Sequence, residues 1–395
     1  MKKLLFALLV SFPVISLAQQ EVPKIFLGID EGGQFAAPAR QDVFTRSADA
    51  NKLLSGWLDI ATEPNSGRMD NVVVAYNNLV WSIMGYGFEN SVRFYDPASD
   101  TWTVVPDSQF PQGNNYARSG ANHGSKVFVY GDATTSGFTG LWSYDMNTST
   151  WTQETPSGTP PAPTGIWAPA WVRDPDTGLL YITGGATTPG GGNLATVYVY
   201  NPSTNTWEEP LPNFTTVRNF HAAYIFNHPT TGNKMLMVAG GNSGGNAISS
   251  TQCYDFTTGL WNLENADAPV LPEARWGMGY THASGSGNHH LWLVGGNGTI
   301  SIMDGSTFLD LESMTWEDGG TYHTSPVYRT SATSLHGTVY KLGGSTGGFS
   351  FTGLASKLED FEYQEPVSVP LTRWTMPGIF MLMLAFTAFR FRPFR

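Results

Sequence analysis

Two patterns of apolar and polar residues recur along the chain, in phase with each other. The first is a short apolar run that ends in glycine. It occurs six times, as LVWSIMG (79–85), KVFVYG (126–131), LLYITGG (179–185), KMLMVAGG (234–241), LWLVGG (291–296) and TVYKLGG (338–344). The runs are rich in β-branched and aromatic residues, and no segment between 60 and 365 shows a helical period over ten or more residues. The pattern therefore predicts six buried strands, each ending where glycine permits a close backbone approach.

The second pattern is a phrase that closes with tryptophan. It reads YDPASDTW, YDMNTSTW, YNPSTNTW, YDFTTGLW and, more weakly, LDLESMTW. Six tryptophans recur about every 50 residues: Trp57, Trp102, Trp151, Trp207, Trp261 and Trp316. A fixed period of this length, built from short strands, is typical of an array of stacked supersecondary units. We therefore expect an all-β chain of six repeats, with these tryptophans packed between them.

The two patterns, with an arginine ahead of several apolar runs, resemble the kelch repeat over about residues 52–365. The resemblance implies a six-bladed β-propeller of four-stranded blades around a channel. Strand A is often led by Arg, strand B ends in Gly-Gly, strand C ends in Tyr-Asp and strand D carries Trp. The glycine pairs have a structural role in this scheme, at Gly184, Gly185, Gly240, Gly241, Gly295, Gly296, Gly343 and Gly344. Four units depart from the pattern, with MGYG, a single Gly131, Leu309-Asp310 and a last unit without Tyr-Asp.

The strand count predicts how the ring closes. Strands B and C number six each if SKLEDFEY (356–363) is the last strand C, but only five tryptophan strands follow a strand C. The sixth, around Trp57, precedes the first strand A. We therefore expect this N-terminal strand to complete the last blade, which removes a free sheet edge.

Composition and charge narrow the range of partners. Glycine (44 residues) and proline (25) supply many turns, and charged residues make up 13 %, about half the usual share. The formal net charge is −11, and removing both end segments would remove six basic and no acidic residues. Such an acidic body should be repelled by nucleic acid and by anionic lipid. Cys253 is the only cysteine, so the chain cannot form an internal disulfide.

Both ends of the chain carry targeting patterns. Residues 1–18 have two lysines, an apolar stretch and small residues before Gln19, the order of a secretory signal peptide, with an uncleaved anchor as the alternative. Residues 19–51 form an N-terminal extension. Segment 366–395 contains VPLTRW, a short apolar run (375–389) that predicts a transmembrane helix, and RFRPFR.

The order within 366–395 resembles bacterial C-terminal sorting signals of the PEP-CTERM and IPTL type. The resemblance implies transient retention in the membrane, a sorting protease, and transfer to the cell surface or exterior. A plain C-terminal anchor is the alternative. In either case we expect the propeller to face outward.

Arginine leads strand A in five units: Arg68, Arg118, Arg218, Arg275 and Arg329, while TGIWAP places Trp167 there in the third. The kelch resemblance implies that such arginines line one mouth of the channel and bind carboxylates, which the guanidinium fork suits. Uneven spacing to the glycine motif predicts that Arg118 and Arg329 are displaced along the strand. Bonding of the arginines to carbonyls or to an Asp of a neighbouring blade is the alternative.

Other chemistry-bearing residues are better explained by structure. His289 and His290 are adjacent and point to opposite faces of a strand, so a shared metal is not expected. His221 is expected to pack and hydrogen-bond, and Asp174 and Asp176 to form a turn. Cys253 is the only candidate for the cross-linked copper site of galactose oxidase, but a small strand residue explains it better. No metal, cofactor or catalytic residue is implied.

The sequence therefore predicts an exported, surface-displayed or surface-released binding module without catalysis. Its expected ligand is a glycan, an acidic peptide or an envelope protein. The alternative is a carbohydrate-active enzyme similar to the exported, six-bladed sialic acid mutarotases. Their acid/base and carboxylate-binding groups could be supplied by an arginine ring.

Overall fold

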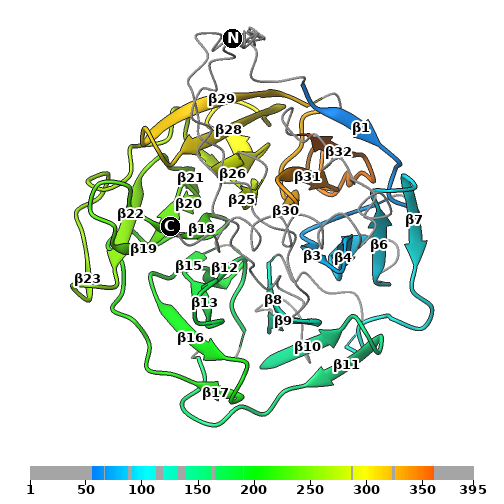
Figure 1. The fold of residues 1–395 in the computed structure, drawn as a ribbon, viewed down its shortest axis with the longest axis horizontal. Helices are drawn as coiled ribbons and strands as arrows, with labels where there is room; N and C mark the ends of the chain where they lie inside the picture. Colours follow the sequence, from blue (N-terminus) through cyan, green and yellow to red (C-terminus); the bar gives the residue numbers. More distant parts are fainter. Residues whose placement is uncertain are drawn as a thin grey trace, which may run out of the picture.

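The chain is represented by a computed structural model. It describes residues 56–359, except for 66, 88–90, 113–118, 132–138, 162–164, 190, 286–287 and 323–324. Six four-stranded antiparallel sheets radiate from a central channel like the blades of a propeller (Figure 1). Within the described residues there is no helix, and hence none long and apolar enough to cross a membrane. The all-β, six-bladed prediction is confirmed, and the predicted C-terminal helix lies outside the described residues.

The blades follow each other around the ring in chain order. Blade 1 contains β3 (Val72–Tyr76), β4 (Leu79–Ile83), β6 (Arg93–Asp96) and β7 (Thr101–Val104), and blade 2 contains β8 (Ala121–His123), β9 (Lys126–Tyr130), β10 (Leu141–Asp145) and β11 (Thr150–Gln153). Blade 3 contains β12 (Ala170–Arg173), β13 (Leu180–Thr183), β16 (Val197–Asn201) and β17 (Thr206–Trp207). Blade 4 contains β18 (Ala222–Asn227), β19 (Lys234–Ala239), β22 (Thr251–Asp255) and β23 (Leu260–Trp261), and blade 5 contains β25 (Gly279–Gly285), β26 (Asn288–Val294), β28 (Gly305–Asp310) and β29 (Thr315–Thr321).

Blade 6 is built from both ends of the described chain. Its strands are β30 (Ser331–Leu335), β31 (Thr338–Leu342), β32 (Ala355–Leu358) and β1 (Leu58–Ile60), and β1 pairs antiparallel with β32 (Figure 1). The Trp57 side chain, just before β1, is completely buried, and its Nε1 donates to Ser306 Oγ at 3.0 Å in blade 5. The structure therefore has the closure by an N-terminal strand that the count predicted.

The Tyr-Asp-to-Trp phrase forms the hairpin between strands C and D. In blade 1 Tyr95 pairs with Trp102 across the two strands, and Asp96 Oδ1 accepts a hydrogen bond from the Ala98 N–H at 2.9 Å. Asp100 occupies the left-handed region with a φ of 52°. The same turn, in which a side-chain oxygen accepts from the N–H two residues later, recurs in blades 2 to 5 at Asp145, Asn201, Asp255 and Asp310. The phrase is thus a turn with an aromatic cross-strand pair above it.

The repeat tryptophans join neighbouring blades. Trp57 and Trp207 are buried, whereas Trp102, Trp151, Trp261 and Trp316 are half-buried. The four half-buried indoles donate from Nε1 to carbonyls in the preceding segment of chain, at Ala61, Ser108, Pro212 and Pro269. Each of these four tryptophans therefore ties its strand D to the loop that enters its blade.

The glycine pairs form main-chain contacts between neighbouring blades. The N–H of the second glycine donates to a carbonyl of the next blade, as Gly185 does to Arg218, Gly241 to Arg275, and Gly344 to Arg68. The first glycine of each pair has a positive φ, and a Cβ on Gly343 would overlap the Arg68 carbonyl oxygen. Gly-Gly therefore marks the point where one blade's strand B touches the entry to the next blade.

Candidate binding face at the mouth of the channel

One face of the propeller collects the loops that enter strand A and leave strand B. Two-stranded sheets form there, between β2 (Arg68–Met69) and β5 (Tyr86–Gly87), and between β24 (Arg275–Trp276) and β27 (Asn297–Gly298). Hairpins β14 (Ala186–Thr188) with β15 (Gly191–Asn193), and β20 (Asn242–Ser243) with β21 (Asn246–Ala247), extend from the same face in blades 3 and 4. We call this side the mouth face.

A ring of main-chain hydrogen bonds narrows the channel at the mouth face. Its members are equivalent residues of five blades, namely Asp70, Ala168, Phe220, Gly277 and Arg329, all with φ between 51° and 65°. The Phe220 N–H donates to the Ala168 carbonyl at 2.9 Å, Gly277 to Phe220 at 2.9 Å, Arg329 to Gly277, and Asp70 to Arg329 at 3.0 Å. The repeated left-handed conformation turns each of these N–H groups toward the preceding blade.

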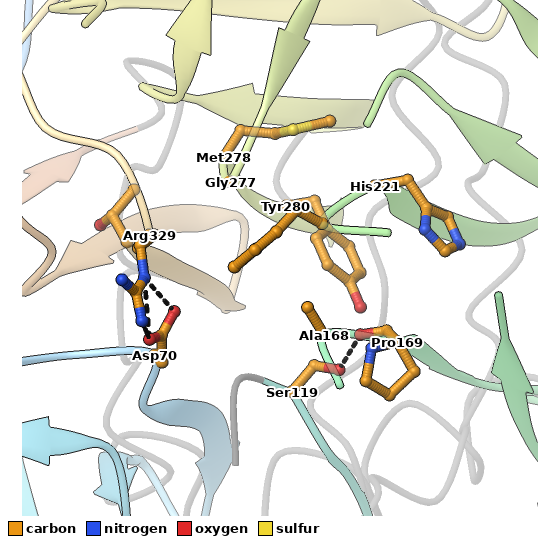
Figure 2. Close-up of a pocket in the computed structure, with 11 residues that line it drawn as sticks. Asp70, Ser119, Ala168, Pro169, His221, Gly277, Met278, Tyr280 and Arg329 are labelled. Atoms are coloured by element: carbon orange, nitrogen blue, oxygen red, sulfur yellow. Dashed lines mark hydrogen bonds and ion pairs between the residues drawn. The ribbon is translucent and has the colours of Figure 1, made fainter. Parts of the chain in front are cut away.

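Behind the ring lies a small cavity of about 30 Å³, whose lining includes Tyr280, His221, Ser119 and Pro169, and the Tyr280 hydroxyl points toward Ala168 and Pro169 (Figure 2). The Tyr280 hydroxyl bridges from blade 5 to blade 3, because it accepts from the Trp171 N–H and donates to the Trp171 carbonyl, both at 2.9 Å. Burial raises the pKa of this hydroxyl to about 12. A cavity of this size holds water but no sugar ring.

The channel widens beyond Tyr280. A cavity of about 450 Å³ runs along the six A strands, and its lining includes main chain from every blade. Its volume falls within the range of small-molecule pockets. The mouth face and this wide part are separated by the hydrogen-bonded ring and by the Tyr280 bridge.

Three of the predicted channel arginines are buried within their own blades. Arg68 donates to the Met84 and Ser91 carbonyls at 2.6 and 2.8 Å, Arg218 to the Gly240 and Ser250 carbonyls at 3.0 and 2.9 Å, and Arg275 to Thr307 Oγ1 at 3.0 Å. Burial lowers the pKa of Arg218 to about 10, although Glu264 opposes this shift. The three guanidinium groups hold the end of strand B to the start of strand C, which is the carbonyl-bonding alternative left open by the sequence.

Arg329 differs from the other arginines because it belongs to the ring. Its Nε lies 3.0 and 2.9 Å from the two Asp70 carboxylate oxygens, so the ion pair joins blade 6 to blade 1 (Figure 2). Val327, two residues earlier, supplies the carbonyl that Arg68, Arg218 and Arg275 supply in their blades. Arg329 is therefore displaced from the repeat position. Arg118 lies outside the described residues.

The sequence reasoning missed a row of aromatic side chains on the mouth face. Trp167, Phe220, Trp276 and Tyr328 come from blades 3 to 6, and consecutive ring centroids are 4.8, 5.1 and 5.2 Å apart. The first three are half-buried and Tyr328 is buried. We call these four residues the aromatic arc. Three of them stand one residue after the repeat position that carries arginine in other blades. Aligning the segments ahead of strand A would have revealed that signal.

A second aromatic group adjoins the arc. Phe349, in the loop after β31, is 61 % exposed, and its ring centroid lies 5.5 Å from that of Tyr86 in blade 1. The Arg329 guanidinium carbon lies 5.8 Å from the ring centroids of both Phe220 and Phe349. Arg329 thus links the arc to the exposed Phe349 through two cation–π contacts.

A group of asparagines includes Asn219, the residue before Phe220 of the arc. Asn219 Nδ2 donates to Asn193 Oδ1 at 3.1 Å, and Asn193 Nδ2 donates to the Asn242 carbonyl at 3.0 Å. Asn246, in the same hairpin as Asn242, is exposed. Amides supply hydrogen-bond donors and acceptors without charge.

The other residues considered from the sequence have structural contacts. His221 Nε2 lies 2.8 Å from Thr183 Oγ1, and burial with the nearby Arg218 holds the pKa of this imidazole well below its usual value. Cys253 is buried in β22, where burial raises the thiol pKa. Asp174 accepts from the Asp176 N–H at 3.0 Å, in the turn the sequence indicated. The described residues contain no group of three or more His, Cys, Asp or Glu that could hold a metal ion.

Comparison with known proteins agrees with the architecture. A family model described as the Attractin/LZTR1 beta-propeller matches residues 80–221, from strand B of blade 1 to the start of blade 4. No curated protein matches the chain. The family match and the six-bladed ring together support a kelch-type propeller.

Proposed function

We propose that the chain is an exported, surface-displayed or surface-released binding module, non-catalytic, whose mouth face receives a glycan. The observation that carries the proposal is the aromatic arc, in which four blades place neighbouring rings on one face. Aromatic side chains offer large rigid apolar surfaces, and binding sites combine such surfaces with a few placed polar groups. The arc and the asparagines beside it have this composition.

The contacts of the arginines favour binding over catalysis of the mutarotase type. The mutarotase alternative requires a ring of arginines whose guanidinium groups bind the ligand carboxylate. In the structure Arg68, Arg218 and Arg275 instead donate to carbonyls and a hydroxyl of their own blades. Diverting these donors to a ligand would leave buried carbonyls without partners, which is costly. The arc needs no such exchange.

The location of the module is proposed from the ends of the sequence. The signal pattern of residues 1–18 supports export, and the apolar segment 375–389 with its arginines supports anchoring in the membrane, at least before processing by a sorting protease. Both segments lie outside the described residues. The acidic body should repel nucleic acid, which we therefore do not propose as a partner.

The proposal is tested with a glycan array and an anomer-exchange assay by NMR on the purified chain. We expect binding on the array and no acceleration of anomer exchange. Phe349→Ala should weaken binding, whereas Leu260→Ala should not, because Leu260 is a similarly exposed apolar residue (63 %) on an outer strand. Binding only to acidic peptides or envelope proteins, or catalysed anomer exchange, would contradict the proposal.

A further inference from the structure

The charged groups beside the aromatic arc do not favour an anionic ligand. Arg329 is the cation that contacts the arc, and its guanidinium is paired with the buried Asp70 carboxylate. An arginine whose charge is already matched by a carboxylate has little to gain from a second one. The arc is therefore no ready-made site for sialic acid or a uronic acid.

Two exposed carboxylates reinforce this conclusion. Glu273 lies next to Gly298 in the loop sheet of blade 5, and Asp304 follows the same loop just before β28. Glu273 is three residues from Trp276, in the loop that enters blade 5. An anionic ligand seated there would meet like charges, which lowers its affinity and its association rate.

The polar groups beside the arc suit hydroxyl groups. The buried Asn219 amide donates to Asn193 Oδ1 and the Asn193 amide donates to the Asn242 carbonyl, while Asn246, in the same hairpin as Asn242, is exposed. Like a sugar hydroxyl, an amide both donates and accepts hydrogen bonds. This asparagine cluster therefore matches an uncharged polyol better than a carboxylate or an ammonium group.

The dimensions of the arc indicate an extended ligand. The three centroid separations of 4.8, 5.1 and 5.2 Å give a row of about 15 Å along its contour. Phe349 and Tyr86 continue the apolar surface into blade 1. Trp167, Phe220 and Trp276 are half-buried and Tyr328 is buried, so the accessible part of the row is about 10 Å long and, together with Phe349, offers contacts to more than one sugar unit.

We propose that the aromatic arc and the asparagine cluster bind an uncharged oligosaccharide chain, with the Asp70–Arg329 pair keeping the floor of the site neutral. This inference rests on the proposed glycan-binding function and specifies its ligand class. Breaking the pair by Asp70→Asn should leave Arg329 with unmatched charge beneath the arc, and so should shift preference toward acidic sugars.

The test is isothermal titration of the full chain with neutral maltohexaose and cellohexaose, with a galacturonate hexamer, and with a glucosamine hexamer. We expect a neutral hexamer to bind about tenfold or more tightly than either charged one, with little change between low and high salt. Phe349→Ala and Asn246→Ala should each weaken neutral binding, whereas Leu260→Ala should leave it unchanged. Asp70→Asn should narrow the gap to the galacturonate hexamer in a salt-dependent way.

The outcomes separate the two proposals. Tighter binding of the galacturonate or the glucosamine hexamer, with strong salt dependence, would overturn the uncharged ligand class and leave glycan binding intact. Absence of binding to any glycan would overturn the proposed function itself. Because Asp70 is buried, the melting temperature of Asp70→Asn is measured first, and the exposed variants Phe349→Ala and Asn246→Ala decide the test if it does not fold.

Discussion

At the scale of single residues, burial strongly lowers the pKa of Lys341. Lys341 is completely buried in β31, donates to the Leu354 carbonyl at 3.1 Å, and lies 5.1 Å from the Tyr322 ring centroid. Burial lowers its pKa from 10.5 to about 7, and the charge of Asp59 opposes part of this shift. The folded state therefore releases this proton far more readily than the unfolded chain does.

This shift predicts how stability depends on pH. Between about pH 7 and 10.5 the unfolded chain holds a proton that folded Lys341 has lost, so stability contributed by this site rises with pH, by roughly 3 to 5 kcal/mol. Below about pH 7 Lys341 is protonated in both the folded and the unfolded state. Burial of its charge then lowers the free energy of unfolding by the full amount. Lys341→Met should raise stability at pH 7 and flatten this slope in urea unfolding across that range. An unchanged slope in the variant would show that Lys341 does not titrate as argued.

The repeat arginines show what the sequence can predict at this scale. Their recurrence ahead of strand A could be read directly, but their carbonyl partners depend on how strands B and C end beneath them. We expect Arg218→Ala to lower the free energy of unfolding by about 3 to 5 kcal/mol, because the Gly240 and Ser250 carbonyls lose a charged donor. Chemical denaturation measures this loss. Loss of ligand binding with unchanged stability would instead support the carboxylate-binding role predicted from the sequence.

At the scale of elements, the repeat motifs encode two features. One is the hairpin between strands C and D, and the other is the glycine contact between neighbouring blades. The Tyr-Asp-to-Trp phrase could be interpreted from sequence because its hydrogen bonds are local, such as Asp96 to Ala98. For the aromatic arc the sequence offers only the recurrence of an aromatic residue ahead of strand A, because the contacts among its four residues form only after four loops of different length have been placed around the ring. Contacts across blades depend on loop conformation, which the periodic pattern does not specify.

Substitution of two glycines with similar backbone angles tests the glycine contact between neighbouring blades. Gly343 has a φ of 62° and an added Cβ would overlap the Arg68 carbonyl, whereas Gly232 has a φ of 72° and no atom within 4 Å of such a Cβ. Gly232→Ala should cost about 1 kcal/mol from backbone strain alone. Gly343→Ala should cost several times more, measured by thermal or urea unfolding. Equal losses would mean that the close approach between blades adds nothing.

At the scale of the whole molecule, the ring is closed by one short strand. The sequence predicted this closure because a count of strands needs only the phase of the motifs, not their packing. The structure adds the contacts: β1 pairs with β32 from Leu58 to Ile60, Trp57 is buried against blade 5, and the Glu63 carboxylate lies 3.0 Å from Arg68 Nε in blade 1. The same segment thus joins three consecutive blades.

Deleting residues 19–60 should therefore open the propeller. The deletion would expose the edge of β32 and remove the Trp57 side chain, whose loss alone is comparable to an aromatic truncation of about 3 to 5 kcal/mol. We expect a large fall in melting temperature and concentration-dependent aggregation, measured by calorimetry and light scattering. Deletion of residues 19–51 is the matched control, because it retains Trp57 and β1. If both deletions melted at the temperature of the parent chain, β1 would not be the strand that holds the ring closed.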